Sequence, residues 1–423
     1  MRPKRTRTLP LSLDQLEDRR LLSSTPQGLS PQQLVTAYGL NNLMFTTSAL
    51  PFPANGTGET IAIIDVYHDP YIYADLAKYD ATFGLPTPGY GGLGQAGAGW
   101  FNVANLAGSA TNDGWAEEEA LDVETAHSVA PGANILVIEA KSDNFNDLLY
   151  AIQFARATPG VGVVSMSWGQ SEFPNEAAYD AYFTTPAGHV GMTFVAASGD
   201  TPGVEWPASS PDVIGVGGTT LNTAATGGYL GETAWTNSGG GYSQYEAEPA
   251  YQYGVQSTGR RSVPDVAFDG DPNTGLSIYA TDPSTGLGTW SVFGGTSLGA
   301  PAWAGIVAII DEGYALAHIL PSMDGGSLTL PMLYGHSSAG IFHGVTAAAA
   351  RRFVPTTPLT TTGLGTPAGV TFLDSMLGYN VLVTNGATAS RAAQAVAASS
   401  SSVSGPASTA GTASTALAIV PTV

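Results

Sequence analysis

A turn of small residues places one serine at the start of an apolar run, which makes that serine a candidate catalytic residue. Residues 294–301 read Gly-Gly-Thr-Ser-Leu-Gly-Ala-Pro, and the apolar run 302–310 that follows predicts a helix. Ser297 therefore lies at or near a helix N-terminus, where free backbone N–H groups favour a developing negative charge. A serine there can serve as a nucleophile, or it can be only the N-cap of the helix.

Two carboxylates four residues apart offer a base for such a serine. Glu118 and Asp122 fall in an expected helix over 115–129, where four residues turn the chain by about 400°, so both side chains share one face. Like charges this close do not both ionise readily, so one carboxyl keeps a raised pKa and can hand on a proton. The alternative is an acidic first turn, because Glu117 and Glu119 flank Glu118 and the helix dipole favours carboxylates there.

Histidine is the usual partner of a serine nucleophile, and the chain has six histidines. His127 lies on the same expected helix but nine residues from Glu118, which is about 900° around the axis and therefore on the opposite side. A histidine base on this helix is not predicted.

Apolar strands that alternate with helices must position these residues. We expect strands over 60–65, 135–140, 162–168 and 191–197, and helices over 31–38, 75–83, 115–129, 145–157 and 177–184. Nearly all-apolar strands indicate a mostly parallel sheet covered by helices, an α/β fold. Ligands bind at the carboxyl ends of such strands, where Asp65, Trp168 and Asp200 fall, so the three could share one crevice. Taken singly, Asp200 is typical of a turn and Trp168 of a core.

Beyond Asp200 the sequence becomes rich in glycine, and we expect short strands over 212–221, 235–242, 277–280 and 289–293. Three segments result: a leader or targeting segment at 1–29, a folded domain at 30–380, and an Ala/Ser/Thr-rich flexible tail at 381–423.

Composition excludes several classes of function. The formal charge is −20, and six of the 14 basic side chains lie within the first twenty residues, so the remainder is more acidic still. Such a body should repel nucleic acid and anionic membrane surfaces. There is no cysteine, hence no disulfide, and no apolar stretch reaches the length of a membrane span.

An ordered set of short motifs resembles the sedolisins, the serine-carboxyl peptidases related to the subtilisins. The motifs are Ile61–Asp65, Glu118 with 121–124, 130–133, 167–169, 197–200, 206–211, 264–267 and 294–297, and the likeness runs from about residue 30 to about residue 377. The resemblance implies a subtilisin-like three-layer fold and peptide hydrolysis at acidic pH.

The same resemblance implies the role of each site residue. Ser297 would be the nucleophile, Glu118 the general base and later acid, and Asp122 the residue that orients Glu118. Asp200 would be the protonated aspartate of the oxyanion hole. Asp65 and Trp168 would extend the hydrogen-bond network of the triad.

The sequence departs from the family in two respects. Fewer than thirty residues precede the expected domain, where sedolisins carry a long propeptide. The family's calcium site has carboxylates where this chain has Gly344 and Leu359, so we expect no required cofactor and no well-formed calcium site.

Two other interpretations stay open. A subtilisin-type triad of Asp65, a histidine and Ser297 would need a histidine at a Gly-rich helix start, and none of the six stands in a His-Gly-Thr sequence. A catalytically silent surface module would keep the fold for binding or display. For the peptidase we expect polypeptide substrates, a monomer, and secretion or display at the cell surface, since residues 16–22 resemble a Leu-Glu-Asp-Arg-Arg-Leu-Leu motif of planctomycete exported proteins.

Overall fold

The computed structural model describes residues 23–46, 51–92, 94–318, 322–345, 359–378 and 382–385. The expected tail from residue 386 onward and most of the expected leader lie outside these residues. Residues 23–29, which we expected in the leader, pair with the body of the domain: Ser23 bridges to Trp290 and Leu29 to Leu276. The strand β20 (Leu382–Asn385), expected in the tail, pairs with β1 (Leu43–Thr46). The domain therefore extends a few residues beyond both predicted boundaries.

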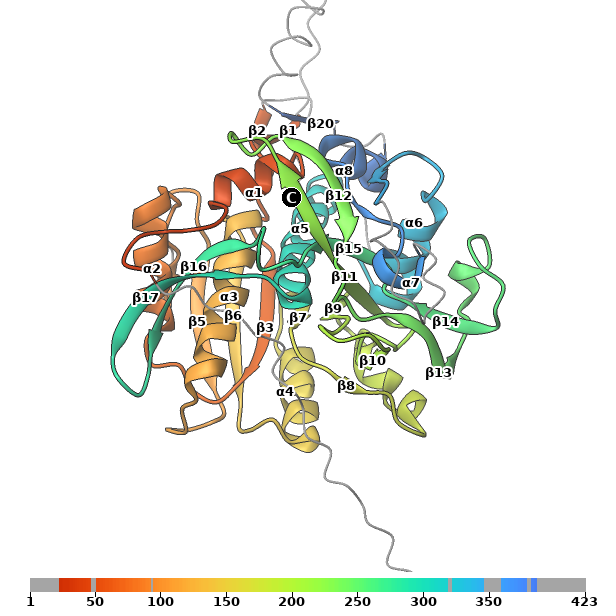
Figure 1. The fold of residues 1–423 in the computed structure, drawn as a ribbon, viewed down its shortest axis with the longest axis horizontal. Coiled ribbons are helices and arrows are strands. Elements are labelled where there is room, and N and C mark those ends of the chain that lie inside the picture. Colours follow the sequence, from red (N-terminus) through yellow and green to blue (C-terminus); the bar gives the residue numbers. More distant parts are fainter. Residues whose placement is uncertain are drawn as a thin grey trace, which may run out of the picture. The chain divides into compact units, whose positions relative to one another are not determined.

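A mostly parallel sheet of nine strands forms the centre of the molecule (Figure 1). Its order is β12-β11-β9-β7-β3-β6-β5-β4, with β15 also paired to β11. The strands are β3 (Thr60–Val66), β4 (Gly89–Tyr90), β5 (Trp100–Asn105), β6 (Asn134–Ala140), β7 (Val161–Met166), β9 (Thr193–Ala197), β11 (Val213–Thr223), β12 (Tyr229–Ala234) and β15 (Val266–Asp269). All described pairs in this sheet are parallel except β11 with β12.

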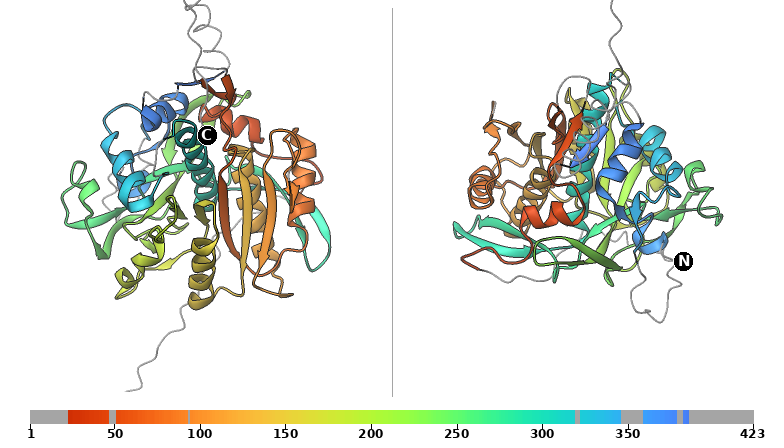
Figure 2. Two further views of the ribbon diagram at one scale, coloured as in Figure 1. Left: turned by 180° about the vertical axis from the view of Figure 1, so that it is seen from behind. Right: turned by 90° about the horizontal axis from the view of Figure 1, so that it is seen from above.

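Helices cover both faces of the sheet, which gives three layers (Figure 2). One core contains residues of α2 (Ile72–Phe83), α3 (Asp113–Val129), α5 (Thr296–Leu316) and α8 (Gly369–Leu377) packed on one face. The other core lies between the opposite face and α4 (Phe145–Ala157). Successive residues of β3 alternate between the two cores, Ile61 and Ile63 facing one and Ala62 and Ile64 the other, as a strand buried on both faces requires. The predicted α/β class and three-layer fold are confirmed.

The short helix α1 (Pro31–Ala37) shows how closely local sequence can dictate an element. Ser30 accepts a hydrogen bond from the backbone N–H of Gln33, whose side chain accepts one from the backbone N–H of Ser30, and Pro31 occupies the first turn. The helix expected over 31–38 is observed over Pro31–Ala37. Within the described residues the other short α-helices are α6 (Leu330–Gly335) and α7 (Leu359–Thr362), and the helix expected over 177–184 is a 3₁₀ helix, η1 (Glu176–Phe183).

A long hairpin leads into the serine helix. Its strands β16 (Leu276–Asp282) and β17 (Leu287–Phe293) contact α2 and α3. Two buried carboxylates fasten it: Asp75 accepts from the backbone N–H and hydroxyl of Thr281, and Glu124 accepts from the N–H of Tyr279. The hairpin therefore holds the turn before Ser297 against the helix that carries Glu118.

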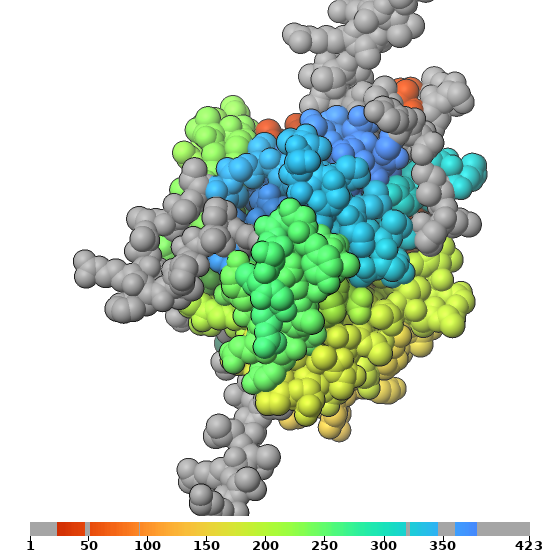
Figure 3. Space-filling model, turned by 90° about the vertical axis from the view of Figure 1, so that its right-hand side faces the viewer, coloured from red at the N-terminus to blue at the C-terminus, as the bar shows by residue number. Residues whose placement is uncertain are grey.

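The expected strand over 235–242 is wrong. Residues 235–240 form a turn between β12 and β13 (Gly241–Ala247), and β13 pairs with β14 (Arg260–Val263). The turn bonds to the loop after β9 instead of to a sheet: Gly239 N–H donates to Gly199 O and Gly240 N–H to Gly203 O, both at 2.6 Å. The segment around β13 and β14, green in Figure 3, forms a ridge on one face of the molecule.

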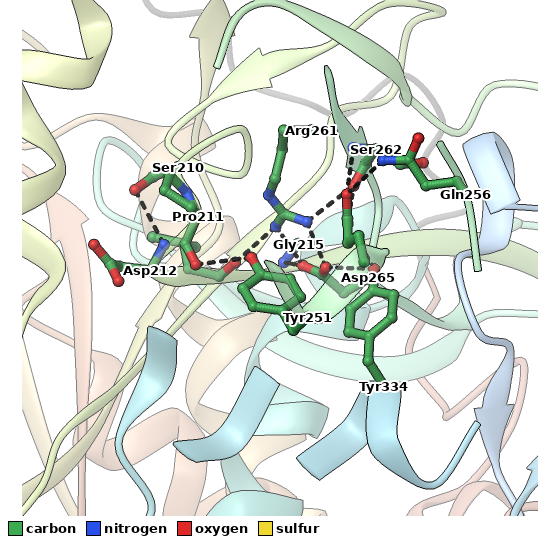
Figure 4. Close-up of polar contacts among 12 residues, drawn as sticks. Ser210, Pro211, Asp212, Gly215, Tyr251, Gln256, Arg261, Ser262, Asp265 and Tyr334 are labelled. Carbon is green, nitrogen blue, oxygen red and sulfur yellow. Dashed lines mark hydrogen bonds and ion pairs between the residues drawn. The ribbon is translucent and has the colours of Figure 1, made fainter. Parts of the chain in front are cut away.

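A buried ion pair ties β14 to the sheet (Figure 4). The guanidinium of Arg261 donates to both carboxylate oxygens of Asp265 at 2.6 Å, and Asp265 also accepts from Tyr334 Oη and from the backbone N–H of Gly215, each at 2.8 Å. Both charged side chains are fully buried. Every hydrogen bond that Asp265 accepts offsets part of the cost of removing its charge from water.

Candidate active site

Ser297 is the second residue of α5, and the N-cap is Gly295. The interpretation of Ser297 as the cap is therefore wrong. Gly295 has a φ of 75°, a conformation that residues with a Cβ rarely adopt. Gly299 lies where a Cβ would come within 2.6 Å of a Val216 side-chain carbon, so the first turns of α5 press closely on β11. Both glycines fix the position of Ser297.

Pro301 leaves one backbone carbonyl at the start of α5 without its usual helical hydrogen bond. Proline has no N–H, so it cannot make the usual helical bond to the carbonyl four residues earlier, which is that of Ser297. The Ser167 hydroxyl donates to Asp122 Oδ1 at 2.7 Å and lies 3.3 Å from that carbonyl oxygen, so its single hydrogen is shared between the two acceptors. Ser167 follows β7, so one hydroxyl connects a strand end to both helices.

The helix α3 presents Glu118 and Asp122 toward α5, against which it packs. Both carboxyl groups are buried, 1% and 0% exposed. Burial, partly opposed by the Ser297 hydroxyl and reinforced by the nearby carboxyls of Asp65 and Asp200, raises the pKa of Glu118 well above its ordinary value. A buried carboxyl beside a serine hydroxyl can exchange a proton with it.

Asp200 lies at the edge of the site, just beyond the end of β9. Its Oδ1 accepts from the backbone N–H of Thr296 at 2.7 Å and from the Thr296 hydroxyl at 2.8 Å. Burial raises the pKa of Asp200 to about 7, against these two bonds, which favour the charged form. At acidic pH this aspartate is therefore protonated and has a hydrogen to donate beside the start of α5.

Asp65 and Trp168 differ in their hydrogen bonding: Asp65 has no partner among the described residues, whereas Trp168 has one. Asp65, at the end of β3, is fully buried, and neither carboxyl oxygen has a hydrogen-bond partner among the described residues. Burial and the charge of Glu139 raise its pKa to about 8. Trp168 donates its indole hydrogen to the backbone carbonyl of Ile64 at 2.9 Å. In this structure Trp168 thus links two strand ends and does not donate to the carboxyl groups.

Three of the histidines lie against groups other than Ser297. His68 lies 2.8 Å from Glu139, and the buried His127 ring lies 3.3 Å from Asp80 on α2. His343 stacks on the ring of Tyr229. The Ser297 hydroxyl donates to the backbone carbonyl of Ser167 at 3.5 Å, and the titratable group whose pKa it affects is Glu118, which disfavours the triad built on a histidine.

Sequence reasoning gave no role to Thr296, Ser167, Glu119 or Glu139, all of which surround the site. Glu139 had a readable signal: Ile135–Glu139 repeats the pattern of Ile61–Asp65, four apolar residues followed by an acid. The two acids pair in register on neighbouring parallel strands. Thr296 and Ser167 carried no such signal, because hydroxyl residues at turns most often serve the local backbone.

The positions implied for calcium supply no carboxylate. Gly344 follows β18 (Phe342–His343) and offers no side chain, and residue 359 is a leucine. The residues at these two positions do not fit a calcium site of several oxygen ligands.

No helix in the described part of the chain is long and apolar enough to cross a membrane.

Comparison with known proteins places the chain in a family. Residues 92–321 match the profile of the Subtilase family. The sequence is 29% identical over 300 residues to sedolisin of Pseudomonas sp. (strain 101), a match that spans 61% of this chain and 47% of sedolisin. It is 30% identical over 398 residues to kumamolisin of Bacillus sp. (strain MN-32), spanning 85% of this chain and 65% of kumamolisin.

Similarity extends to a solved structure. Pseudomonas sedolisin, a serine-carboxyl proteinase complexed with two molecules of pseudo-iodotyrostatin, superposes with a TM-score of 0.67 at 25% identity over 84% of this chain and all of that one. The chain thus spans about half to two thirds of the length of the first two curated relatives. Profile, relatives and fold agree that the chain belongs to the subtilase family and, within it, to the sedolisins.

Proposed function

We propose that the protein is a serine-type peptidase that hydrolyses peptide bonds at acidic pH through an acyl-enzyme on Ser297. The observation that carries the proposal is that Ser297, at the start of α5, lies close enough to the buried Glu118 carboxyl of α3 for its hydroxyl to lower the Glu118 pKa. In this structure the Ser297 hydroxyl donates to the Ser167 carbonyl at 3.5 Å, so it turns to Glu118 for the reaction. The similarity to sedolisin, a serine-carboxyl proteinase, and to kumamolisin supports the same chemistry.

In the first step Glu118 takes the hydroxyl proton of Ser297 as its oxygen attacks the substrate carbonyl carbon. The resulting tetrahedral intermediate collapses when Glu118 returns the proton to the leaving amine, and the C–N bond breaks. Water then attacks the ester in the same way, giving its proton to Glu118, and Ser297 recovers its own. Protons and bonds balance over the cycle, and no cofactor enters it.

In this proposal Asp200 stabilises the tetrahedral intermediate by donating a hydrogen bond to its oxyanion. Its Oδ1 already accepts two hydrogen bonds from Thr296, so the acid proton is best placed on Oδ2, from which it can be donated to the oxyanion. The nearby N-terminus of α5 favours the same negative charge. The donor is lost once Asp200 ionises, which confines activity to pH values below about 7.

Asp122 orients Glu118 in this proposal, and Ser167 in turn holds Asp122 through its hydrogen bond at 2.7 Å. Asp65 is an outer member of the network. Trp168 supports it only through the backbone of Ile64.

Several further properties belong to the same proposal. The enzyme would act on polypeptides as a secreted or cell-surface monomer, would not bind nucleic acid because of its strong negative charge, and would not need calcium. Addition of a chelator tests the last point: neither activity nor thermal unfolding should change, and a clear loss of either would contradict it.

The test is cleavage of a denatured protein substrate from about pH 3 to about pH 8 by the wild type, Ser297→Ala and Glu118→Ala. We expect an acidic optimum for the wild type and a loss of roughly 10³- to 10⁶-fold in both variants, as for other catalytic units of this kind. Far-ultraviolet circular dichroism confirms that the variants fold. Equal activity in all three proteins would overturn the proposal and favour a silent binding or display module.

A further inference from the structure

Behind the triad lies a second group of buried acids that the proposed mechanism does not use. Asp65 on β3 and Glu139 on β6 are direct neighbours in the parallel register, so their side chains point to the same face of the sheet. That is the face on which α3 packs, because Asp65 and Glu118 influence each other. Both Asp65 and Glu139 are fully buried.

A strained turn brings a histidine to this group. Tyr67, directly after β3, has a φ of 66°, a left-handed conformation that is costly for a residue with a side chain. The turn places the Nδ1 of His68 at 2.8 Å from both carboxyl oxygens of Glu139. The backbone N–H of Asp69 donates to Glu139 Oε1 at 3.1 Å. The His68 side chain is 29% exposed, so the pair reaches from the buried acids to solvent.

Glu119 completes the group from α3. It is the neighbour of Glu118 in sequence, but the charges that act on it are those of Asp69, Glu139, Asp65 and Asp122. Three of the acids keep oxygens without a hydrogen-bond partner among the described residues: Asp65 (both oxygens), Asp69 (Oδ2) and Glu119 (Oε1). Ionising a buried carboxyl group that lacks hydrogen-bond donors costs free energy, whereas the protonated form is far less unfavourable there.

The titratable groups that surround this cluster come from every element packed on it. They are Asp65 of β3, His68 and Asp69 of the following turn, Asp75 of α2, Glu117, Glu118, Glu119 and Asp122 of α3, Glu139 of β6, and Asp200 after β9.

Burial raises the pKa of all four acids in the cluster, that of Asp65 to about 8, that of Asp69 to about 7 and that of Glu119 well above its ordinary value. For Glu139 the same burial effect is opposed by the hydrogen bond and charge of His68. Glu139 thus differs from Asp65 in having donors on its carboxyl oxygens, from His68 and from the Asp69 N–H, which stabilise its charged form.

We propose that Glu139 and His68 are positioning residues: the Glu139 carboxylate, held by His68 and the Asp69 N–H, keeps Asp65 and Glu119 protonated and thereby sets the pH at which Glu118 ionises. The anion of Glu139 lies beside Asp65, and Asp65 in turn acts on Glu118. The proposal rests on the peptidase function of Ser297 for its kinetic consequence, although the protonation states can be measured without activity.

The kinetic consequence concerns the acid limb of the pH–activity profile, where the general base ionises. Glu139→Gln removes the anion beside Asp65, so the carboxyls near Ser297 ionise more easily and the acid limb moves by about one pH unit to lower pH. Glu119→Gln replaces a neutral acid with a neutral amide, so its acid limb stays in place. His68→Gln moves the limb in the wild type but not further in the Glu139→Gln background, because His68 acts through Glu139.

The second measurement is the infrared carbonyl band of protonated carboxyl groups at about pH 6, which does not depend on activity. Glu119→Gln should remove intensity equivalent to one group, and Glu139→Gln should not. Glu312→Gln is the matched control: Glu312 is buried, its pKa is raised to about 7, and it accepts from Asn55 and Gly56 N–H at the other end of α5. That variant should lose band intensity without moving the acid limb.

The outcomes separate the two proposals. If Ser297→Ala cleaves as fast as the wild type, the peptidase function fails, and the infrared comparison still decides the protonation states. If cleavage depends on Ser297 but the acid limb of Glu139→Gln coincides with that of the wild type, the positioning proposal is overturned. An infrared loss in Glu139→Gln instead of Glu119→Gln would overturn it as well.

Discussion

Two of the regions that contain buried carboxyl groups stabilise them in opposite ways. Asp265 has a guanidinium bonded to both oxygens, with Tyr334 and the Gly215 N–H as further donors. Asp65, Glu118 and Glu119 lie just as deep, but no guanidinium or ammonium group is among the influences on them. The first arrangement stabilises a charge and fixes a fold. The second stabilises protons and leaves them available for exchange.

The number of donors on a buried carboxyl group therefore distinguishes a structural acid from a catalytic one. A carboxylate whose lone pairs are all engaged by donors has little reason to take up a proton, whereas a buried carboxyl with few donors holds one until the pH is well above its ordinary pKa. The predictions that follow test the contrast, beginning with the largest expected effect.

The stability of the folded protein should fall as the pH rises from about 5 to about 8.5. Folding raises the pKa of Asp200 to about 7 and that of Asp65 and Asp269 to about 8. The native state then binds more protons than the unfolded state, so this contribution is complete below the unfolded pKa values and is lost as the pH rises through the native ones. Because several groups act together, the change should exceed that of any single substitution. Urea unfolding across this range measures it, and a stability that rises toward pH 8.5 would contradict the contrast.

Asp265→Asn should destabilise the protein by about 3–5 kcal/mol, because the charge of Arg261 would stay buried without its partner. Asp65→Asn is the matched comparison, an equally buried aspartate with no bonded partner among the described residues, and it should cost less than about 1 kcal/mol. Both values come from denaturant unfolding at about pH 5. Similar losses in the two variants would remove the distinction between the regions.

Asp200 tests whether a proton held by burial is used in the reaction. Asp200→Ala should lose about 10²- to 10³-fold in kcat, the usual cost of one oxyanion donor. Asp200→Asn keeps a donor at every pH, so the alkaline limb near pH 7 should disappear while part of the activity remains. Initial rates measured at a temperature where both variants are folded give the answer. An alkaline limb that persists in Asp200→Asn would assign it to another group.

Elements with strong local signals were predictable from the sequence. The helix of Glu118 was expected over 115–129 and observed over Asp113–Val129, and the strand of Asp65 was expected over 60–65 and observed over Thr60–Val66. In both, periodic or continuous apolar residues specify the burial directly. The strand β5 (Trp100–Asn105) escaped prediction because it is only half buried and carries asparagines among its apolar residues.

The site was predictable as a set of residue types, but the partners that adjust them were not. Nothing in the local sequence shows that Ser167 contacts Asp122, that Thr296 bonds twice to Asp200, or that Gly239 and Gly240 bond to the loop after β9. These contacts join segments far apart in the chain, so only the folded sheet and its crossovers bring them together. The same reason hides the register of Asp65 with Glu139.

The central claim is that Ser297 forms a covalent intermediate with Glu118 as its base. The most direct test is mass spectrometry of the protein after incubation at about pH 4 with a peptide-based probe that acylates serine nucleophiles. The account predicts one adduct per chain, located on Ser297, absent from Ser297→Ala and formed far more slowly in Glu118→Ala. An adduct on another residue, or equal labelling of the wild type and Ser297→Ala, would contradict it.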